Sequence, residues 1–309
     1  MLKKVDKELL AKEEAQARQT YPSPDVPTIE PLLPDAIAVA SENAGIKKAK
    51  KDLTTQFMLA MLGGAFVGLG AMFAMITITG AEGFMSYGLT RLLMGITFSL
   101  GLLLVVIAGA QLFTSDCLMV MAWAGGRLDT GRMLKVWSTV WAGNFVGSVA
   151  LALIIFLSGH YMAAKGEIGA TAIALASYKS MLPVSKAFFA GILCNVLVCL
   201  AVWLTLSARS LTDKVFAILF PISAFVAAGF EHCVANMFFI PYGLLIKYGA
   251  SEAFWATEAG MRVAALDIPI DTFLRNLAFV TLGNWVGGAL LVGAIYWFIF
   301  RRGSKAHAY

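Results

Sequence analysis

Long apolar stretches alternate with short polar segments along this chain. Four stretches, residues 55–80, 136–156, 186–206 and 272–300, are each long enough to cross the membrane once, since about 20 helical residues cover about 30 Å of hydrocarbon. Two others, residues 92–126 and 215–248, are 35 and 34 residues long. These are too long for one span and too short for two spans and a turn, so we expect each to be a helix that is interrupted within the membrane.

Both long stretches carry polar side chains near their middle. In chain order these are Gln111, Thr114, Ser115, Asp116, Glu231, His232 and Asn236. Lipid cannot satisfy the backbone N–H and C=O groups that an interruption frees, so each break must face protein or a water-accessible cavity. Two such breaks predict a solute pathway near the middle of the membrane.

The two halves of the chain share a short string, GNFVG at residues 143–147 and GNWVG at residues 283–287. Each string lies in the last span of its half and follows the interrupted stretch. We therefore predict an all-α membrane protein of two related three-span halves, with broken second and fifth helices. Because three spans is an odd number, the second half would insert upside down and bring the two breaks face to face. Close helix packing alone also explains the glycines of these strings.

Composition and charge agree with a membrane protein. Hydrophobic residues make up 59% of the 309 residues and charged residues only 14%, against about 25% charged in globular proteins. With both termini in the cytoplasm, 17 of the 24 lysines and arginines lie on the cytoplasmic side, as the positive-inside rule requires. We expect residues 1–52 to form an attached cytoplasmic tail with an amphipathic helix, residues 53–302 the six-span domain, and residues 303–309 a cytoplasmic tail.

His232 is the most informative single residue, because an ionisable group at membrane depth indicates function. The other two histidines, His160 and His307, lie in a loop and in the tail. A neutral histidine that simply bonds within the bundle is the alternative. We expect the neighbouring Glu231 to bind backbone N–H groups freed at the end of a half-helix, since adjacent residues cannot both point into one pore.

Three further polar residues carry expectations. Thr114 offers a hydroxyl from the opposite break, as a donor to solute, as a helix cap, or as both. Asn195 is the only amide in its span and would orient the imidazole or line the path, with interhelical bonding as the alternative. Asp116 is expected to cap a half-helix. The dispersed histidines and cysteines indicate no metal, haem or other cofactor, and no hydrolase triad is present, so we expect no enzyme.

Six segments together resemble the formate/nitrite transporter family, most closely its bacterial formate channels. They read PDAIAVASENAGIKKAKKD, TFSLGLLLVVIAGAQLFTSD, GILCNVLVCLAVWL, SARSLTDK, FEHCVANMFFIP and LGNWVGG. The likeness covers nearly the whole chain after residue 33. It implies an aquaporin-like protomer with one pore, assembled as a homopentamer in the bacterial inner membrane, that passes formate and related small anions under control of pH.

The resemblance also implies roles for particular residues. His232 would be the central histidine, Asn195 its partner, Lys179 an outer lysine that attracts anions, and Asn284 a neighbour of the central site. Apolar constrictions would form at Phe98, Leu102, Leu112, Phe113 and Phe225. Gln111 departs from the family pattern, in which an acidic residue precedes the LFTS string, and the N-terminal extension is longer than expected.

Several functional hypotheses stay open at this level. A proton or strong hydrogen bond from His232 would neutralise a carboxylate at an apolar constriction. Formate flux would then depend on pH, and formate entry would be coupled to protons at low pH. Nitrite, hydrosulfide or lactate fit the same fold. A membrane subunit of an oxidoreductase, with His232 as a cofactor ligand, and a scaffold without a pore are the other classes. The N-terminal tail would gate the pore, bind a formate-metabolising enzyme, or be simply solvated.

Overall fold

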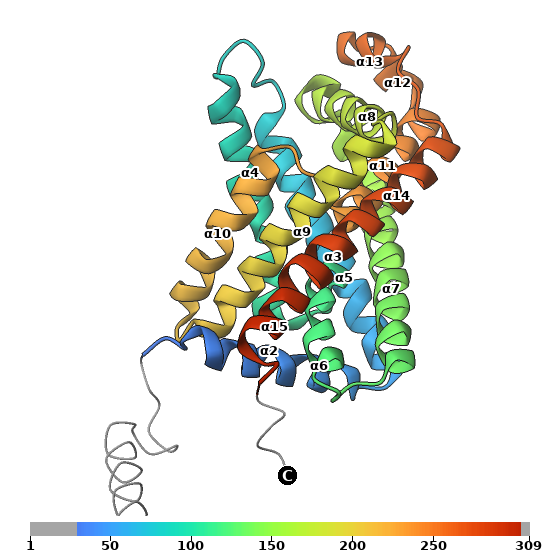
Figure 1. Ribbon diagram of the computed structural model, residues 1–309. Helices are drawn as coiled ribbons and strands as arrows, with labels where there is room; N and C mark the ends of the chain where they lie inside the picture. The colour runs from blue at the N-terminus through green and yellow to red at the C-terminus, as the bar shows by residue number, and fades with distance from the viewer. Residues whose placement is uncertain (1–29, 304–309) are drawn as a thin grey trace, which may run out of the picture.

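Six helices long and apolar enough to cross a membrane stand side by side in the computed structural model, which describes residues 30–303 (Figure 1). They are α3 (Leu53–Ile78), α4 with the π-helical η1 (Tyr87–Gly109), α7 (Thr130–Leu157), α9 (Val184–Ser207), α10 (Leu211–Ala227) and the continuous α14–η4–α15 (Ile270–Phe300). Every regular element between residues 30 and 303 is helical. The prediction of an all-α membrane protein with six spans is confirmed.

Two of these helices are followed by a break and a second, shorter helix. The first helix ends at Gly109, and α5 (Phe113–Asp116), η2 (Cys117–Met119) and α6 (Val120–Ala124) follow it. After α10 the chain resumes as α11 (Cys233–Gly249). Gly109, the last residue before the first break, and Gly229, within the second, have φ of +88° and +76°, a left-handed conformation that glycine adopts without the penalty of a Cβ.

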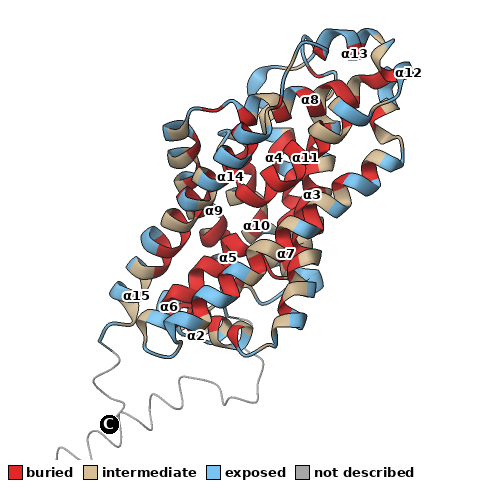
Figure 2. Ribbon diagram, turned by 90° about the vertical axis from the view of Figure 1, so that its right-hand side faces the viewer, coloured by how far each residue is buried: buried red, intermediate tan, exposed pale blue. Residues whose placement is uncertain are grey.

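Burial follows the helix faces (Figure 2). All four residues of α5 and most of α11 are buried, so both short helices lie inside the bundle. Large apolar side chains such as Ile154, Phe189 and Phe220 are 61–69% exposed on the outer faces of the spans. A hydrophobic exterior of this kind is what lipid requires and what water disfavours.

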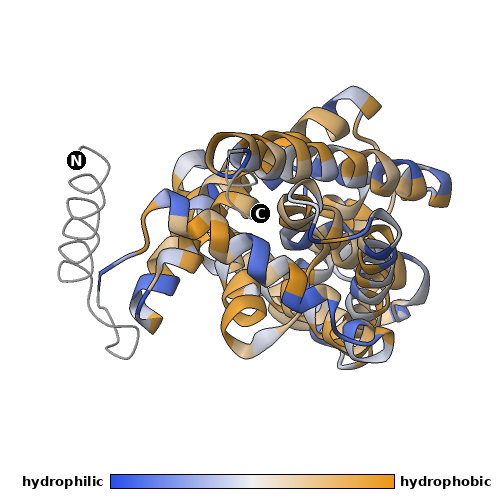
Figure 3. Ribbon diagram, turned by 60° about the horizontal axis from the view of Figure 1, so that its bottom comes forward, coloured by the Kyte–Doolittle hydropathy of each residue, from blue (hydrophilic) through white to orange (hydrophobic). Residues whose placement is uncertain are grey.

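The two ends of the bundle carry different short helices. Helix α2 (Pro34–Ala49) crosses one end, and α8 (Glu167–Ser180), α12 (Glu252–Trp255) and α13 (Glu258–Val263) lie at the other (Figure 1). We call these the α2 face and the α8 face. In a view toward the α2 face, most residues of the spans are hydrophobic, and hydrophilic residues lie mainly in connections and at helix ends (Figure 3).

Helix α2 packs against the bundle through an ion-pair cluster as well as through apolar contacts. The buried carboxylate of Glu42 accepts hydrogen bonds from Arg127 at 3.3 Å and from Arg301 at 3.0 and 3.2 Å. Gly45 of α2 packs against Met119, and an added Cβ would lie in van der Waals contact, 3.4 Å from the Met119 Cα. The segment expected as an amphipathic helix is therefore docked. Residues 1–29 of the N-terminal tail, which would gate the pore, bind an enzyme or be solvated, lie outside the described residues.

Candidate functional site

The first break is held by one asparagine from a neighbouring span. Asn144 in α7 accepts a hydrogen bond from the Phe113 N–H at 2.9 Å through its Oδ1. Its Nδ2 donates to the carbonyls of Gln111 at 2.9 Å and Ala60 at 2.7 Å. One amide thus satisfies a donor and an acceptor that the break removes from the helical ladder.

The second break is held in the same way by Asn284. Its Oδ1 accepts from the Cys233 N–H at 2.9 Å, and its Nδ2 donates to the carbonyls of Glu231 at 2.9 Å and Gly191 at 2.8 Å. These contacts match those of Asn144 position for position, which accounts for the matching Gly-Asn strings. The sequence predicted no specific role for Asn144, although its place in the repeat was a signal. The inverted, aquaporin-like relation of the halves stays a prediction.

His232 and Thr114 bring the two breaks into contact. The His232 Nε2 lies 3.1 Å from the Thr114 Oγ1, and both side chains are buried. The Nδ1 of His232 accepts from the Ala235 N–H at 3.1 Å and so caps α11. Because Nδ1 acts as the acceptor, the proton of the neutral imidazole belongs on Nε2, which donates to the threonine hydroxyl.

The expected capping roles of the acidic residues are wrong. The imidazole of His232 caps α11, whereas the Glu231 carboxylate accepts hydrogen bonds from Lys179 Nζ at 2.8 Å and Asn236 Nδ2 at 2.7 Å. At the first break the Asn144 side chain, from α7, accepts the Phe113 N–H at the start of α5, and the Asp116 carboxylate forms an ion pair with Lys48 instead. The physical reason is that a buried carboxylate is stabilised more by a cation than by a single N–H group.

A cluster of a lysine, an acid and an amide lies at each break. At the first, Lys48 Nζ lies 2.6 Å from the Asp116 Oδ1, and Gln111 Nε2 donates to the other carboxylate oxygen at 3.2 Å. Gln111, which departs from the family pattern, thus donates to a buried carboxylate. At the second break Lys179, Glu231 and Asn236 form the corresponding cluster.

Asn276 extends the second cluster. It accepts from Asn236 Nδ2 at 2.8 Å and donates to the Lys179 carbonyl at 2.7 Å. Removing one partner of a buried ion pair typically costs about 3–5 kcal/mol, because it leaves an uncompensated charge, so each break depends on both members of its pair. Sequence analysis did not single out Lys48 or Asn276, since neither lies within a break.

Asn195 in α9 links the first break to α14 (Ile270–Trp285) through their backbone carbonyls. Its Nδ2 donates to the carbonyls of Thr114 at 3.2 Å and Asn284 at 2.6 Å. The imidazole of His232 bonds to the Thr114 hydroxyl and the Ala235 N–H, whereas Asn195 bonds to the backbone carbonyl of Thr114.

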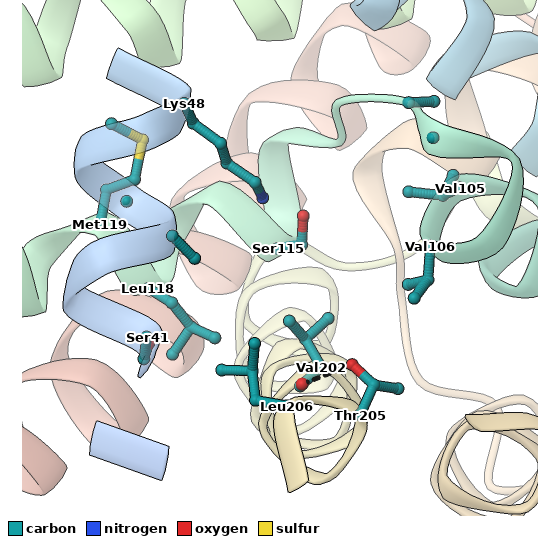
Figure 4. Close-up of a pocket in the computed structure, with 14 residues that line it drawn as sticks. Ser41, Lys48, Val105, Val106, Ser115, Leu118, Met119, Val202, Thr205 and Leu206 are labelled. Atoms are coloured by element: carbon teal, nitrogen blue, oxygen red, sulfur yellow. Dashed lines mark hydrogen bonds between the residues drawn. The ribbon is translucent and has the colours of Figure 1, made fainter. Parts of the chain in front are cut away.

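Two cavities approach the Thr114–His232 contact from opposite faces. The cavity at the α8 face, about 460 Å³, is lined by residues that include Phe98, Lys179 and Phe225, and it reaches His232. The cavity at the α2 face, about 210 Å³, reaches Ser115 (Figure 4). In Figure 4 Lys48 extends from α2 toward Ser115.

The residues expected as constrictions fall into two groups. Phe98 and Phe225 meet edge to face with ring centroids 5.7 Å apart, and the Phe225 ring stacks 6.0 Å from His232. Leu102 and Leu112 are buried in the core. Phe113 instead lines a hollow of about 540 Å³ between α7 and α14, with Trp137, Trp141 and Trp285. The pore role of all five stays a prediction.

Six apolar spans, two internal breaks and two cavities that converge on one buried polar contact define a membrane transport protein. A family model described as formate/nitrite transporter matches residues 35–298. The chain belongs to this family, so the resemblance drawn from its motifs is confirmed.

Similar proteins and structures agree. The chain is 43% identical to the formate channel FocA of Escherichia coli (strain K12), over 89% of this chain and 97% of the relative. It is 44% identical to FocA of Haemophilus influenzae, over 82% and 89% of the two chains. A solved "Pentameric formate channel with formate bound" superposes with a TM-score of 0.75 at 43% identity, covering 80% of this chain and 97% of that one.

Proposed function

We propose that this protein is a formate channel and that the anion crosses at the Thr114–His232 contact. The observation that carries the proposal is a pair of hydrogen-bonding side chains, 3.1 Å apart, buried where cavities from opposite faces approach each other. Relatives at 43–44% identity that are named formate channels support formate as the cargo.

The barrier to a bare anion comes from the aromatic rings beside His232. Phe98 and Phe225 offer no hydrogen bonds, and an unpaired charge in such surroundings costs several kcal/mol even after relaxation. The imidazole Nε2–H and the Thr114 hydroxyl replace lost water for a carboxylate that enters between them. A small planar carboxylate fits this exchange, because each of its oxygens accepts one of the two donors.

The cap on α11 ties protonation of His232 to the presence of the anion. An imidazolium carries a second proton on Nδ1, which would then face the Ala235 N–H and lose the capping bond, at a cost of about 1 kcal/mol. A formate beside Nε2 offsets this cost through its negative charge. Protonation therefore accompanies the anion at low pH, and uptake of formate is proton-coupled and dependent on pH.

The polar residues around the contact hold it in place. Asn195 fixes the Thr114 carbonyl, Asn284 fixes the second break, and Glu231 is bound by Lys179. These side chains line or support the anion path without leaving a carboxylate unpaired in it. Leu102 and Leu112 complete the apolar surroundings.

We further propose a homopentamer in the bacterial inner membrane with the α2 face in the cytoplasm. The pentameric solved relative supports the assembly, and the excess of lysine and arginine in the α2-face segments supports the orientation. Nitrite is the second candidate cargo, since it shares the charge and size of formate and the family is defined by both anions.

The test is flux into proteoliposomes that contain the purified protein. Formate uptake should exceed nitrite uptake and should rise as the outer pH falls from about 7.5 to about 5.5. Equal rates with empty liposomes would refute channel activity, and a preference for nitrite would replace the proposed cargo.

A further inference from the structure

The α8-face cavity carries more positive charge than its lining acid can neutralise. Its charged lining residues are the cations Arg91, Lys179 and Lys186 and the single carboxylate of Glu231. Lys179 and Glu231 form an ion pair whose side chains are only 12% and 3% exposed. Among residues 30–303 neither of the other two cations has a carboxylate partner.

Arg91 lies where α10 ends before the second break. From α4, its Nε donates to the Ala227 carbonyl at 3.1 Å, and its Nη2 donates to the Val226 carbonyl. The last carbonyls of a helix lack helical partners and carry partial negative charge, so a guanidinium suits them well. Carbonyls carry no net charge, and the full positive charge of Arg91 remains at the cavity wall.

Lys186 contributes less than Arg91 to the positive electrostatic potential in the cavity. It is exposed to solvent, its Nζ bonds to the Tyr178 hydroxyl at 3.3 Å, and it lies over the Tyr178 ring at 5.7 Å. Water and salt screen such a charge, whereas the half-buried Arg91 sits against low-dielectric walls that focus its field into the cavity.

The opposite cavity lacks this excess. Its one charged lining residue, Lys48, is paired with Asp116 at 2.6 Å. Of these two cavities, only the one at the α8 face therefore has cations in its lining without a carboxylate partner among residues 30–303.

We infer that Arg91, and not Lys179, draws the permeant anion into the α8-face cavity, while its guanidinium also fixes the last turn of α10 beside the break. The inference rests on the proposed function, because it assigns the entry step of an anion pathway. It reassigns the attracting role that the resemblance implied for Lys179, whose charge is already neutralised by Glu231.

The first test replaces Arg91 and varies ionic strength. Formate uptake from the α8 face is measured against formate concentration in about 20 mM and about 300 mM of an impermeant salt. Arg91→Gln should raise the half-saturating formate concentration about threefold in low salt, with a smaller difference in high salt. Arg91→Lys should keep the salt dependence of the parent protein, and Lys186→Gln should change it little.

A second pair of variants leaves Arg91 and its hydrogen bonds in place. The Arg91 Nη1 lies 3.5 Å from the Met94 Sδ, so Met94→Glu sets a carboxylate beside the guanidinium and cancels its charge. Met94→Gln is the neutral control of equal size. The glutamate variant should raise the half-saturating concentration about threefold over the glutamine variant in low salt.

The outcomes separate this inference from the proposed function. If the parent protein carries no formate, the proposed function fails. If it carries formate but Arg91→Gln lowers only the maximal rate, equally at both salt concentrations, Arg91 is structural and the inference is overturned. Equal half-saturation for the two Met94 variants overturns it as well, even where Arg91→Gln fails to fold.

Discussion

Replacing His232 with asparagine removes the proton-binding group of the central contact and keeps a side chain that can cap α11. In the structure the imidazole makes one bond as acceptor, from the Ala235 N–H, and one as donor, to the Thr114 hydroxyl. Asparagine carries both an acceptor oxygen and an N–H donor, and it is among the best N-cap residues. Unlike histidine, it cannot bind a proton at physiological pH.

The cost of the change follows from these two bonds. His232→Ala loses the cap, about 1 kcal/mol, and leaves the buried Thr114 hydroxyl without its partner, about 1–3 kcal/mol. His232→Asn keeps the cap, because its amide oxygen can take the place of Nδ1, but the shorter side chain does not extend to the position of Nε2. It should therefore cost less than His232→Ala. The asparagine variant therefore tests the loss of proton binding in a folded protein, and the alanine variant shows how much stability is lost with the side-chain hydrogen bonds.

The assay is formate uptake into proteoliposomes between about pH 5.5 and about pH 7.5. The parent protein should take up formate several-fold faster at the lower pH, whereas His232→Asn should vary by less than about twofold. His160→Asn is the matched control, since it removes an imidazole from η3 (His160–Gly166) near the α8 face, away from the break. A pH dependence retained in full by His232→Asn would refute the assignment of His232 as the proton-binding group.

Three further predictions follow from other contacts. Thr114→Ala should lower formate flux by about tenfold through loss of one donor, while Thr114→Ser keeps the hydroxyl and most of the rate; equal flux in both variants would remove Thr114 from the path. Lys48→Met should destabilise the detergent-solubilised protein by about 3–5 kcal/mol, and the added change Asp116→Leu should restore much of that loss, as measured by thermal unfolding; additive losses would contradict a buried pair. Asp52 caps α3 by accepting hydrogen bonds from the Thr55 hydroxyl at 2.6 Å and the Thr55 N–H at 2.9 Å, and these bonds lower the pKa of its carboxyl below 3.8. The stability difference between the parent protein and Asp52→Ala should therefore be full above pH 3.8 and disappear as the pH falls through the lowered pKa. A stability difference that does not change with pH would exclude the charged cap.

The spans, their breaks and the central histidine could be predicted from the chain alone. Hydrophobic length is a local property, and bilayer thickness converts it directly into helix number. The stretches of 35 and 34 residues could not be single spans, and the described helices divide within both of them, before Phe113 and before Cys233. The polar residues of the two breaks then pointed to His232 and Thr114, which the structure places 3.1 Å apart although 118 positions separate them.

The partner of each polar side chain was decided only by tertiary structure. Sequence patterns made Glu231 and Asp116 helix caps, but packing brought a lysine to each carboxylate and left the capping of α11 to His232. Arg91 gave no sequence signal of its own, and its meaning arises because α4 lies beside the end of α10. A buried polar group takes whichever partner the neighbouring helices bring within reach, and that choice depends on contacts between residues far apart in the chain.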